Sequence, residues 1–104
     1  MNYEVIFNEK SSTQCMKDQT YNKMFIDATL RYYRDLVACR GYVFLNDILS
    51  ALGLENIQRG QTEGWKKELQ ITVVESVILT GLRENNAFVL TFTTEGNILD
   101  VFKN

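Results

Sequence analysis

Apolar side chains recur along this chain with two different periods. Residues 2–8 (NYEVIFN) alternate apolar and polar positions, which predicts a short, half-buried strand. A helical period then follows, and Ser11 with Gln14 has the three-residue spacing of a capping box. We therefore expect a long helix over about residues 12–39. Gly41 suits the left-handed position that ends such a helix.

The apolar positions of this long helix cover a wide arc. At about 100° per residue they span about 200°, although one packing partner needs a stripe of only about 100°. One flank carries Tyr21, Phe25, Ala28, Tyr32, Leu36 and Cys39, and the other carries Ile26, Leu30, Tyr33 and Val37. The surplus predicts that a second copy or another protein covers part of the helix, with Tyr32, Tyr33 and Val37 as candidate contact residues.

A second, shorter helix is expected after an extended stretch at residues 42–44. Asn46 is placed to cap it, Asp47 lies near the positive end of its dipole, and Gly53 ends it. Its buried side is expected to comprise Ile48, Leu49 and Leu52. Residues 55–68 contain two glycines among polar side chains, which is typical of an irregular connection.

The last third of the chain alternates apolar and polar positions again. Residues 69–80 predict a strand, and a change of phase around residues 74–75 indicates a bulge or bend. Turn chemistry at residues 83–86 and again at 94–97 brackets another strand, and residues 98–102 predict a final one. Two successive turns predict a C-terminal three-stranded antiparallel β-meander packed on the helices.

Composition agrees with one α+β domain over residues 1–104. Hydrophobic residues make up 45% of the chain, enough for a packed core. The 11 basic and 13 acidic residues form no basic patch, so nucleic acid is an unfavoured partner.

Several features predict a cytoplasmic protein with free thiols and no membrane segment. Cys15 and Cys39, placed on one helix, would lie roughly 36 Å apart, too far for a disulfide. No apolar run approaches the roughly 18 residues of a membrane span. The chain opens Met1-Asn2-Tyr3-Glu4, without the basic and apolar regions of a signal peptide.

The sequence offers no catalytic site, metal site or cofactor site. It contains no histidine, which removes the commonest general base and the commonest zinc ligand. Gly60 and Gly64 lack the lysine and the preceding strand of a phosphate loop. Acidic residues are scattered, and a pair such as Glu63 and Glu68 is common on any acidic surface. We therefore expect a protein that is not an enzyme.

Trp65 is the most distinctive residue outside the helices. A lone tryptophan behind a glycine, within a polar stretch, either fills the edge of the core or contacts a partner. Both interpretations remain open from sequence, so Trp65 joins the candidate contact residues.

The stretch GYVFLNDILSALGL (residues 41–54), followed by GQTEGW (residues 60–65), resembles small uncharacterised α+β domains of Gram-positive bacteria and their phages or mobile elements. The matching residues are Gly41, Tyr42, Leu45, Asn46, Asp47, Leu52, Gly53, Leu54, Gly60, Gly64 and Trp65. The resemblance implies a long helix and a capped short helix before a Gly-Trp pair and a short antiparallel sheet. It brings no catalytic residues, so function stays open.

Two functions remain in view. The wide helical arc favours a non-catalytic protein-protein interaction or accessory domain, of phage or mobile-element origin, whose partner is a second copy or an unknown protein. The alternative is a winged-helix-like nucleic-acid-binding protein, in which residues 56–67 (NIQRGQTEGWKK) would supply the recognition helix. Two glycines within that segment disfavour the alternative, since each costs about 1 kcal/mol in a helix interior.

Overall fold

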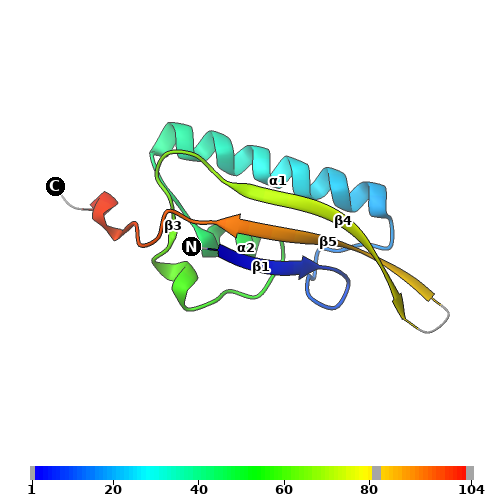
Figure 1. The fold of residues 1–104 in the computed structure, drawn as a ribbon. Coiled ribbons are helices and arrows are strands. Elements are labelled where there is room, and N and C mark those ends of the chain that lie inside the picture. Colours follow the sequence, from blue (N-terminus) through cyan, green and yellow to red (C-terminus); the bar gives the residue numbers. More distant parts are fainter. Residues whose placement is uncertain (1, 81–82, 103–104) are drawn as a thin grey trace.

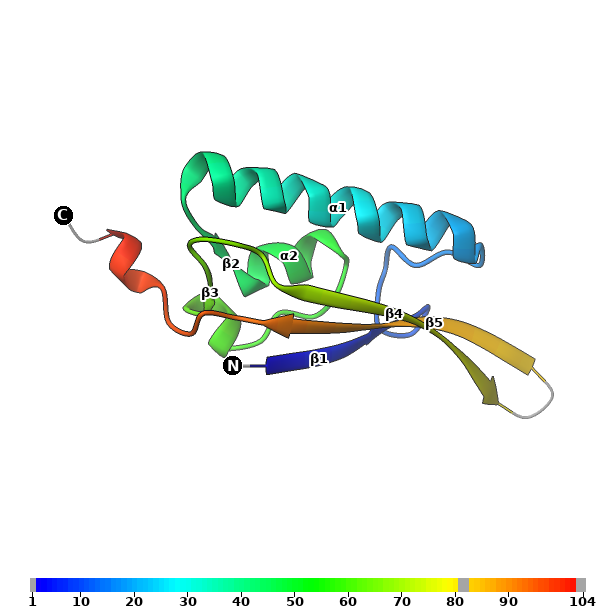
Figure 2. The ribbon, with the colours of Figure 1, turned by 45° about the horizontal axis from the view of Figure 1, so that its top comes forward.

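A computed structural model describes residues 2–80 and 83–102, except for the side chains of residues 76–80 and 83–86. Its elements are β1 (Asn2–Phe7), α1 (Gln19–Arg40), β2 (Val43–Phe44), α2 (Leu45–Ala51), η1 (Arg59–Gln61), β3 (Gly64–Trp65), β4 (Ile71–Thr80), β5 (Arg83–Thr93) and η2 (Leu99–Phe102). Both α-helices lie on one face of a three-stranded sheet, and the other face carries no helix (Figure 1, Figure 2).

The sheet has the antiparallel order β1-β5-β4, and a separate pair of short strands joins β2 to β3. The α+β class is therefore confirmed, with an N-terminal strand, a long helix, a short helix and then antiparallel strands against the helices. The third strand of the sheet is the N-terminal one, because β1 pairs with residues 88–93 of β5. Residues 99–102, predicted as part of a final strand, form the 3₁₀ helix η2 instead.

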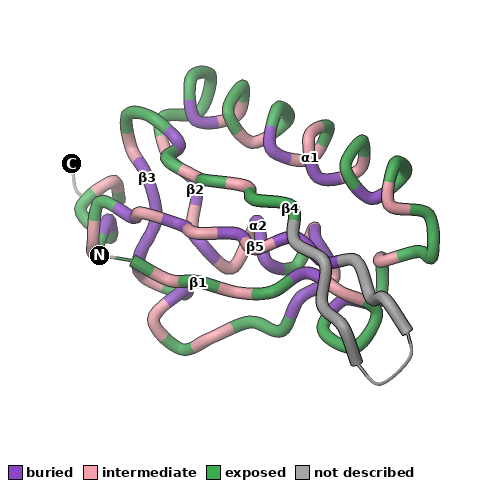
Figure 3. Tube along the Cα trace, turned by 45° about the vertical axis from the view of Figure 1, so that its right-hand side comes forward, coloured by how far each residue is buried: buried purple, intermediate pink, exposed green. Residues whose placement is uncertain are grey.

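Alternate residues of the strands meet one stripe of α1 and the apolar side of α2 in the core. The largest fully buried side chains are Trp65, Phe7, Phe88, Phe92, Ile26, Leu30, Leu45, Ile48, Leu49, Leu52, Leu90 and Ile98. Figure 3 shows the buried positions of α1 on the side that faces the sheet, and they are Asn22, Ile26, Leu30 and Val37. Burial thus follows the helical period of α1 and the two-residue period of the strands.

Helix α1 begins at Gln19, later than the predicted start near residue 12. The Asp18 carboxylate caps it by accepting a hydrogen bond from Tyr21 N at 3.1 Å. The polar groups of the preceding segment have other partners: the buried Ser12 hydroxyl donates to Leu52 O, and Thr13 N donates to the carbonyl of Gly53. The helix therefore does not start at the predicted capping box of Ser11 and Gln14, because this segment is bonded to the end of α2 instead.

The predicted ends of both helices are confirmed. Gly41 follows α1 with φ 92° and donates its N–H to Val37 O at 2.8 Å. Gly53 follows α2 with φ 72°, and Leu54 N reaches back to Leu49 O at 2.8 Å. This last pattern is a Schellman motif, which needs a left-handed residue and therefore favours glycine.

Asn46 lies inside the first turn of α2 and is not its cap. Its carboxamide donates to Ile57 O at 2.9 Å and accepts from Ile57 N at 3.0 Å. Asp47 accepts from Phe44 N at 3.1 Å, which satisfies one of the free N–H groups at the start of the helix. Asn46 thus holds the connection after α2 in place.

The hairpin of β4 and β5 has no bulge. Its register runs unbroken from Ile71 opposite Phe92 to Thr80 opposite Arg83, so of the bulge or bend predicted at residues 74–75 the bulge is excluded. Residues 83–86, predicted as a turn, belong to β5, and the connection at 81–82 lies outside the described residues. Cross-strand pairing over the whole length of β4 prevailed over the local turn preference of Asn85 and Asn86.

Candidate aromatic interaction surface

The glycines of the GxxxGW stretch are required by close packing of the backbone. A Cβ on Gly64 would overlap the carbonyl oxygen of Val43 and lie 2.8 Å from Phe44 Cα. A Cβ on Gly60 would overlap the carboxamide of Asn46. These glycines therefore let β3 and η1 approach β2 and α2, and they serve the fold.

Trp65 fills the core. Its side chain is fully buried, its indole N–H donates to Thr93 O at 2.7 Å, and its ring lies 6.3 Å from that of Phe92. Val37 is also buried, with 2% of its surface exposed. Neither side chain is open to a partner, which leaves Tyr32 and Tyr33 from the predicted contact set.

Tyr32 and Tyr33 belong to a larger group of rings at the end of the molecule where α1 meets β2 and η2. We call this group the aromatic surface, and it comprises Tyr32, Tyr33, Arg40, Tyr42, Phe44 and Phe102. The last turns of α1 supply the first three residues, the extended stretch after Gly41 supplies the next two, and η2 supplies the last. Segments some 60 residues apart in the chain thus form one surface.

Ring contacts connect most of this surface. Tyr42, Phe44 and Phe102 form a triangle with centroid distances of 5.7 Å for Tyr42–Phe44, 5.4 Å for Tyr42–Phe102 and 6.0 Å for Phe44–Phe102. The Arg40 guanidinium lies over the Tyr42 ring, 4.2 Å from its centroid. Edge-to-face and cation–π geometries of this kind stabilise an aromatic group beyond simple burial.

Charged groups link Tyr33 to the triangle. Arg40 lies 3.6 Å from the Asp47 carboxylate and donates from Nε to Tyr42 O at 3.1 Å. Burial raises the pKa of Tyr33, the nearby Asp47 carboxylate and Tyr32 add to the rise, and Arg40 opposes it. The Tyr33 phenol therefore stays protonated at neutral pH and remains a hydrogen-bond donor.

Two side chains at the ends of the aromatic surface remain open to solvent. Tyr32 is 60% exposed although its ring meets Tyr33 edge-on at 5.0 Å, and Phe102 is also 60% exposed. Leu99, beside Phe102 in η2, is 43% exposed. Aromatic residues and arginine are the types enriched at protein-protein interfaces, so this surface has the composition of a binding site.

Tyr32 and Tyr33 could be predicted from the sequence as contact residues, but the triangle of Tyr42, Phe44 and Phe102 was not predicted. Tyr42 and Phe44 lie two residues apart in an extended stretch, so both point to one side while Val43 points into the core. That spacing could have predicted that the rings of Tyr42 and Phe44 lie on the same side of the chain. Phe102 offered none, because its contact with Tyr42 joins segments that only the tertiary fold brings together.

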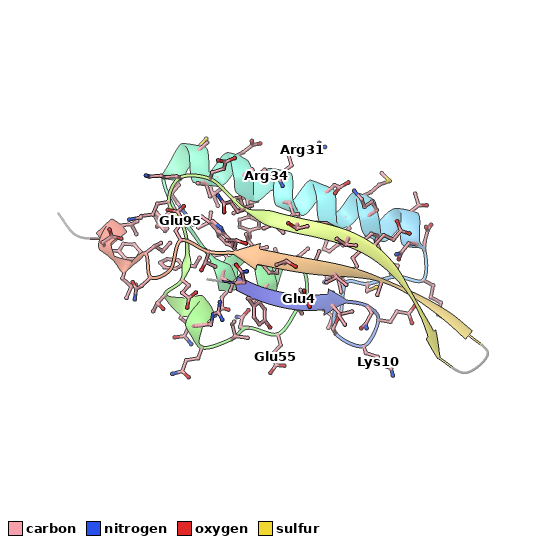
Figure 4. All side chains as sticks on the ribbon, in the orientation of Figure 1. Glu4, Lys10, Arg31, Arg34, Glu55 and Glu95 are labelled. Atoms are coloured by element: carbon pink, nitrogen blue, oxygen red, sulfur yellow. The ribbon has the colours of Figure 1, made fainter. Side chains whose placement is uncertain are left out.

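The outer face of the sheet is a weaker candidate. Ile6, Val74 and Val89 form one apolar row across its three strands, and threonines and Glu4 flank it. A shallow depression of about 520 Å³ opens beside this row at β1 and the following turn. Lys10 points away from Glu4 there (Figure 4), and the polar groups of Asn8 and Ser11 are hydrogen-bonded to the backbone of the turn itself. Antiparallel sheets commonly leave such a face in water.

The carboxylates and the thiol that could take part in catalysis or metal binding have partners within the fold. Glu63, 7% exposed, accepts a hydrogen bond from the Thr94 hydroxyl at 2.9 Å and lies 3.3 Å from Arg59 Nε, whereas Glu68 is exposed. Cys15 lies 3.3 Å from the Asn22 amide, and burial raises the pKa of its thiol. Among the residues whose side chains the structure describes, no three Cys, Asp or Glu side chains are placed to hold a metal ion.

The recognition helix of the nucleic-acid alternative is absent. Residues 55–67 are all described, and they contain only the three-residue η1, the two-residue β3 and irregular chain. A winged-helix reader needs a full helix in this place to enter the major groove. Among the described residues, no helix is both long and apolar enough to cross a membrane.

The model of DUF6353, a family of unknown function, matches residues 1–102, so the chain belongs to this family. No curated protein matches the chain, and neither does any solved structure. The Gram-positive and phage or mobile-element origin implied by the sequence resemblance stays a prediction.

Proposed function

We propose that this member of DUF6353 is a non-catalytic interaction domain that binds another protein through the aromatic surface. The exposed aromatic cluster carries the proposal. Large apolar side chains in water cost free energy, and a connected group of them is typical of surfaces that bind a partner. Tyr32 is 60% exposed and its ring contacts Tyr33 edge-on, and the rings of Tyr42 and Phe44 contact each other, so these rings are already partly held in place. Binding would therefore cost little side-chain entropy.

The inventory of reactive groups supports a non-catalytic role. The sequence contains no histidine. The buried carboxylate of Glu63 is held by Arg59 and Thr94, so it is poorly placed to accept a proton from a substrate. The phenols of Tyr32 and Tyr33 offer hydrogen bonds to a partner, which suits recognition.

Affinity capture from a lysate of the source organism tests this proposal. We expect Tyr32→Ala to lower the affinity for the captured protein by about 2 kcal/mol or more, roughly thirtyfold, because binding energy at interfaces concentrates on a few aromatic residues. Thr72→Ala, an exposed change on the outer face of the sheet, is the matched control and should retain the protein. Equal capture by both variants would contradict the proposal.

Light scattering of the purified protein separates the two kinds of partner. A dimer that dissociates on the Tyr32→Ala change identifies the partner as a second copy. A monomer in both cases assigns the surface to a different protein. Melting temperatures of the variants should agree within a few degrees, since Tyr32 contributes little to the core.

A further inference from the structure

The 3₁₀ helix η2 supplies Phe102 to the aromatic surface and thereby covers the part that Tyr42 and Phe44 form. Two contacts of unlike kind are among those that hold it there. Phe102 rests on the rings of Tyr42 and Phe44, and Asp100 lies 2.9 Å from the Lys66 ammonium. We propose that the surface recognises a short segment with an acidic residue two positions before an aromatic one, and that η2 is an intramolecular occupant of that place. This inference rests on the proposed function and names the chemistry of the partner.

The firm anchor of the C-terminal segment lies before η2. Ile98 is fully buried, its N–H donates to Thr62 O at 2.9 Å, and Asn97 forms a bridge with Glu63. Beyond Ile98 the character changes, because Leu99 and Phe102 are largely exposed. The segment can therefore leave the surface at Ile98 without opening the core.

The contacts of η2 itself are modest. Phe102 keeps 60% of its surface in water, and the Lys66 and Asp100 side chains of the ion pair are 36% and 53% exposed. Exposed ion pairs hold weakly, and one partly covered ring adds little. Because η2 is joined to the anchored Ile98, it is present beside Tyr42 and Phe44 at an effective concentration of about millimolar, as for a short linker. This connection, more than the contacts, keeps η2 in place. A partner that also contacts Tyr32 can displace η2.

Positive charge on the rim of the surface matches the acidic position. The Glu95 carboxylate accepts hydrogen bonds from Lys66 N at 2.8 Å and Lys67 N at 3.0 Å, which fixes the backbone that presents both lysines. Lys66 then reaches Asp100. Arg40 lies above the Tyr42 ring, where the Asp47 carboxylate 3.6 Å away offsets part of its charge. Lys66 and Lys67 therefore supply most of the positive charge. An acidic side chain beside the ring triangle is therefore favoured over a basic one.

A labelled peptide with the sequence of residues 95–104 (EGNILDVFKN) tests the inference against the full chain. In the full-length double variant Asp100→Ala/Phe102→Ala the tethered competitor is lost. We expect the peptide to bind this variant at least tenfold more tightly than the unmodified chain, as read by fluorescence anisotropy. A peptide with alanine at its aromatic position, or with lysine at its acidic position, should bind the double variant with at least tenfold lower affinity.

Charge exchange provides the second arm of the test. Adding Lys66→Glu to the double variant should weaken its binding of the original peptide. The same change should restore binding of the peptide that carries lysine at the acidic position. Lack of binding to the double variant, equal binding to both chains, or no response to the peptide changes would overturn the inference. A dimer of the unmodified chain that the double variant abolishes would also overturn it, because η2 would then occupy a second copy.

Failure of this inference is distinguishable from failure of the proposed function. Peptide binding can be absent while Tyr32→Ala still abolishes capture of a protein, in which case the surface binds a partner of different chemistry. Loss of both results removes the proposed function as well.

Discussion

Replacing Gly64 with alanine is expected to lower the free energy of unfolding by about 4 kcal/mol or more, or to prevent folding. The added methyl group would enter the backbone of β2, overlapping Val43 O and approaching Phe44 Cα. Backbone atoms cannot rotate away as a flexible side chain can, so β3 must separate from β2. Urea denaturation followed by far-UV circular dichroism measures the change.

Gly41→Ala is the matched control for Gly64→Ala. Gly41 has a left-handed φ of 92°, but nothing lies within 4 Å of the position of a Cβ there. The strain of that conformation costs about 1–2 kcal/mol, and no steric overlap adds to it. Equal losses in the two variants would show that the close approach of β3 to β2 is not the reason for Gly64.

Trp65→Ala is expected to cost about 3–5 kcal/mol, because it leaves a large cavity in the core. Trp65 is fully buried against Phe92, and its removal also takes the indole donor from Thr93 O. Trp65→Phe keeps an aromatic ring and should lower the free energy of unfolding by less than Trp65→Ala does. Thermal and urea unfolding of both variants check the order. A cost below about 1 kcal/mol for Trp65→Ala would place the residue at a surface instead.

These two residues show why the resemblance carried by residues 41–54 and 60–65 brings no function with it. Gly60 and Gly64 permit close packing, Asn46 holds Ile57, and Trp65 fills the core. Every one of these roles is structural. The exposed aromatic residues that carry the proposed function lie partly outside these ranges.

Helix ends could be predicted where the backbone needs a positive φ, because glycine adopts that conformation far more readily than other residues. Gly41 and Gly53 both adopt positive φ, and both end helices as expected. The start of α1 could not be predicted in this way, because Ser11 and Asp18 both satisfy local capping rules. Contacts of Ser12 with the end of α2, some 40 residues away, decided between them.

Strand neighbours were harder to predict than strands. Alternation correctly placed β1 and most of β4 and β5, but period alone does not say which strand lies beside which. Residues 98–102 and β1 were both available as the third strand. Burial of Ile98 and its hydrogen bond to Thr62 O direct the C-terminal segment away from the sheet edge, and β1 takes the place beside β5.

The wide arc of α1 was predicted from sequence, but its meaning changed with the structure. The sheet and α2 bury the flank with Ile26, Leu30 and Val37. The other flank leaves Tyr21 and Tyr32 exposed, at 47% and 60%. Sequence periodicity therefore identified a surplus of apolar surface, while only the fold showed that its C-terminal end continues into Tyr42, Phe44 and Phe102.

Photo-crosslinking in cells of the source organism tests the central claim, that the aromatic surface contacts a partner. The photoreactive residue p-benzoylphenylalanine would replace Tyr32 on the aromatic surface in one chain and Thr72 on the outer face of the sheet in another. Both positions are exposed, so neither replacement disturbs the core. A discrete protein adduct is expected from position 32 and none from position 72. An adduct from position 72 alone, or from neither position, would contradict it.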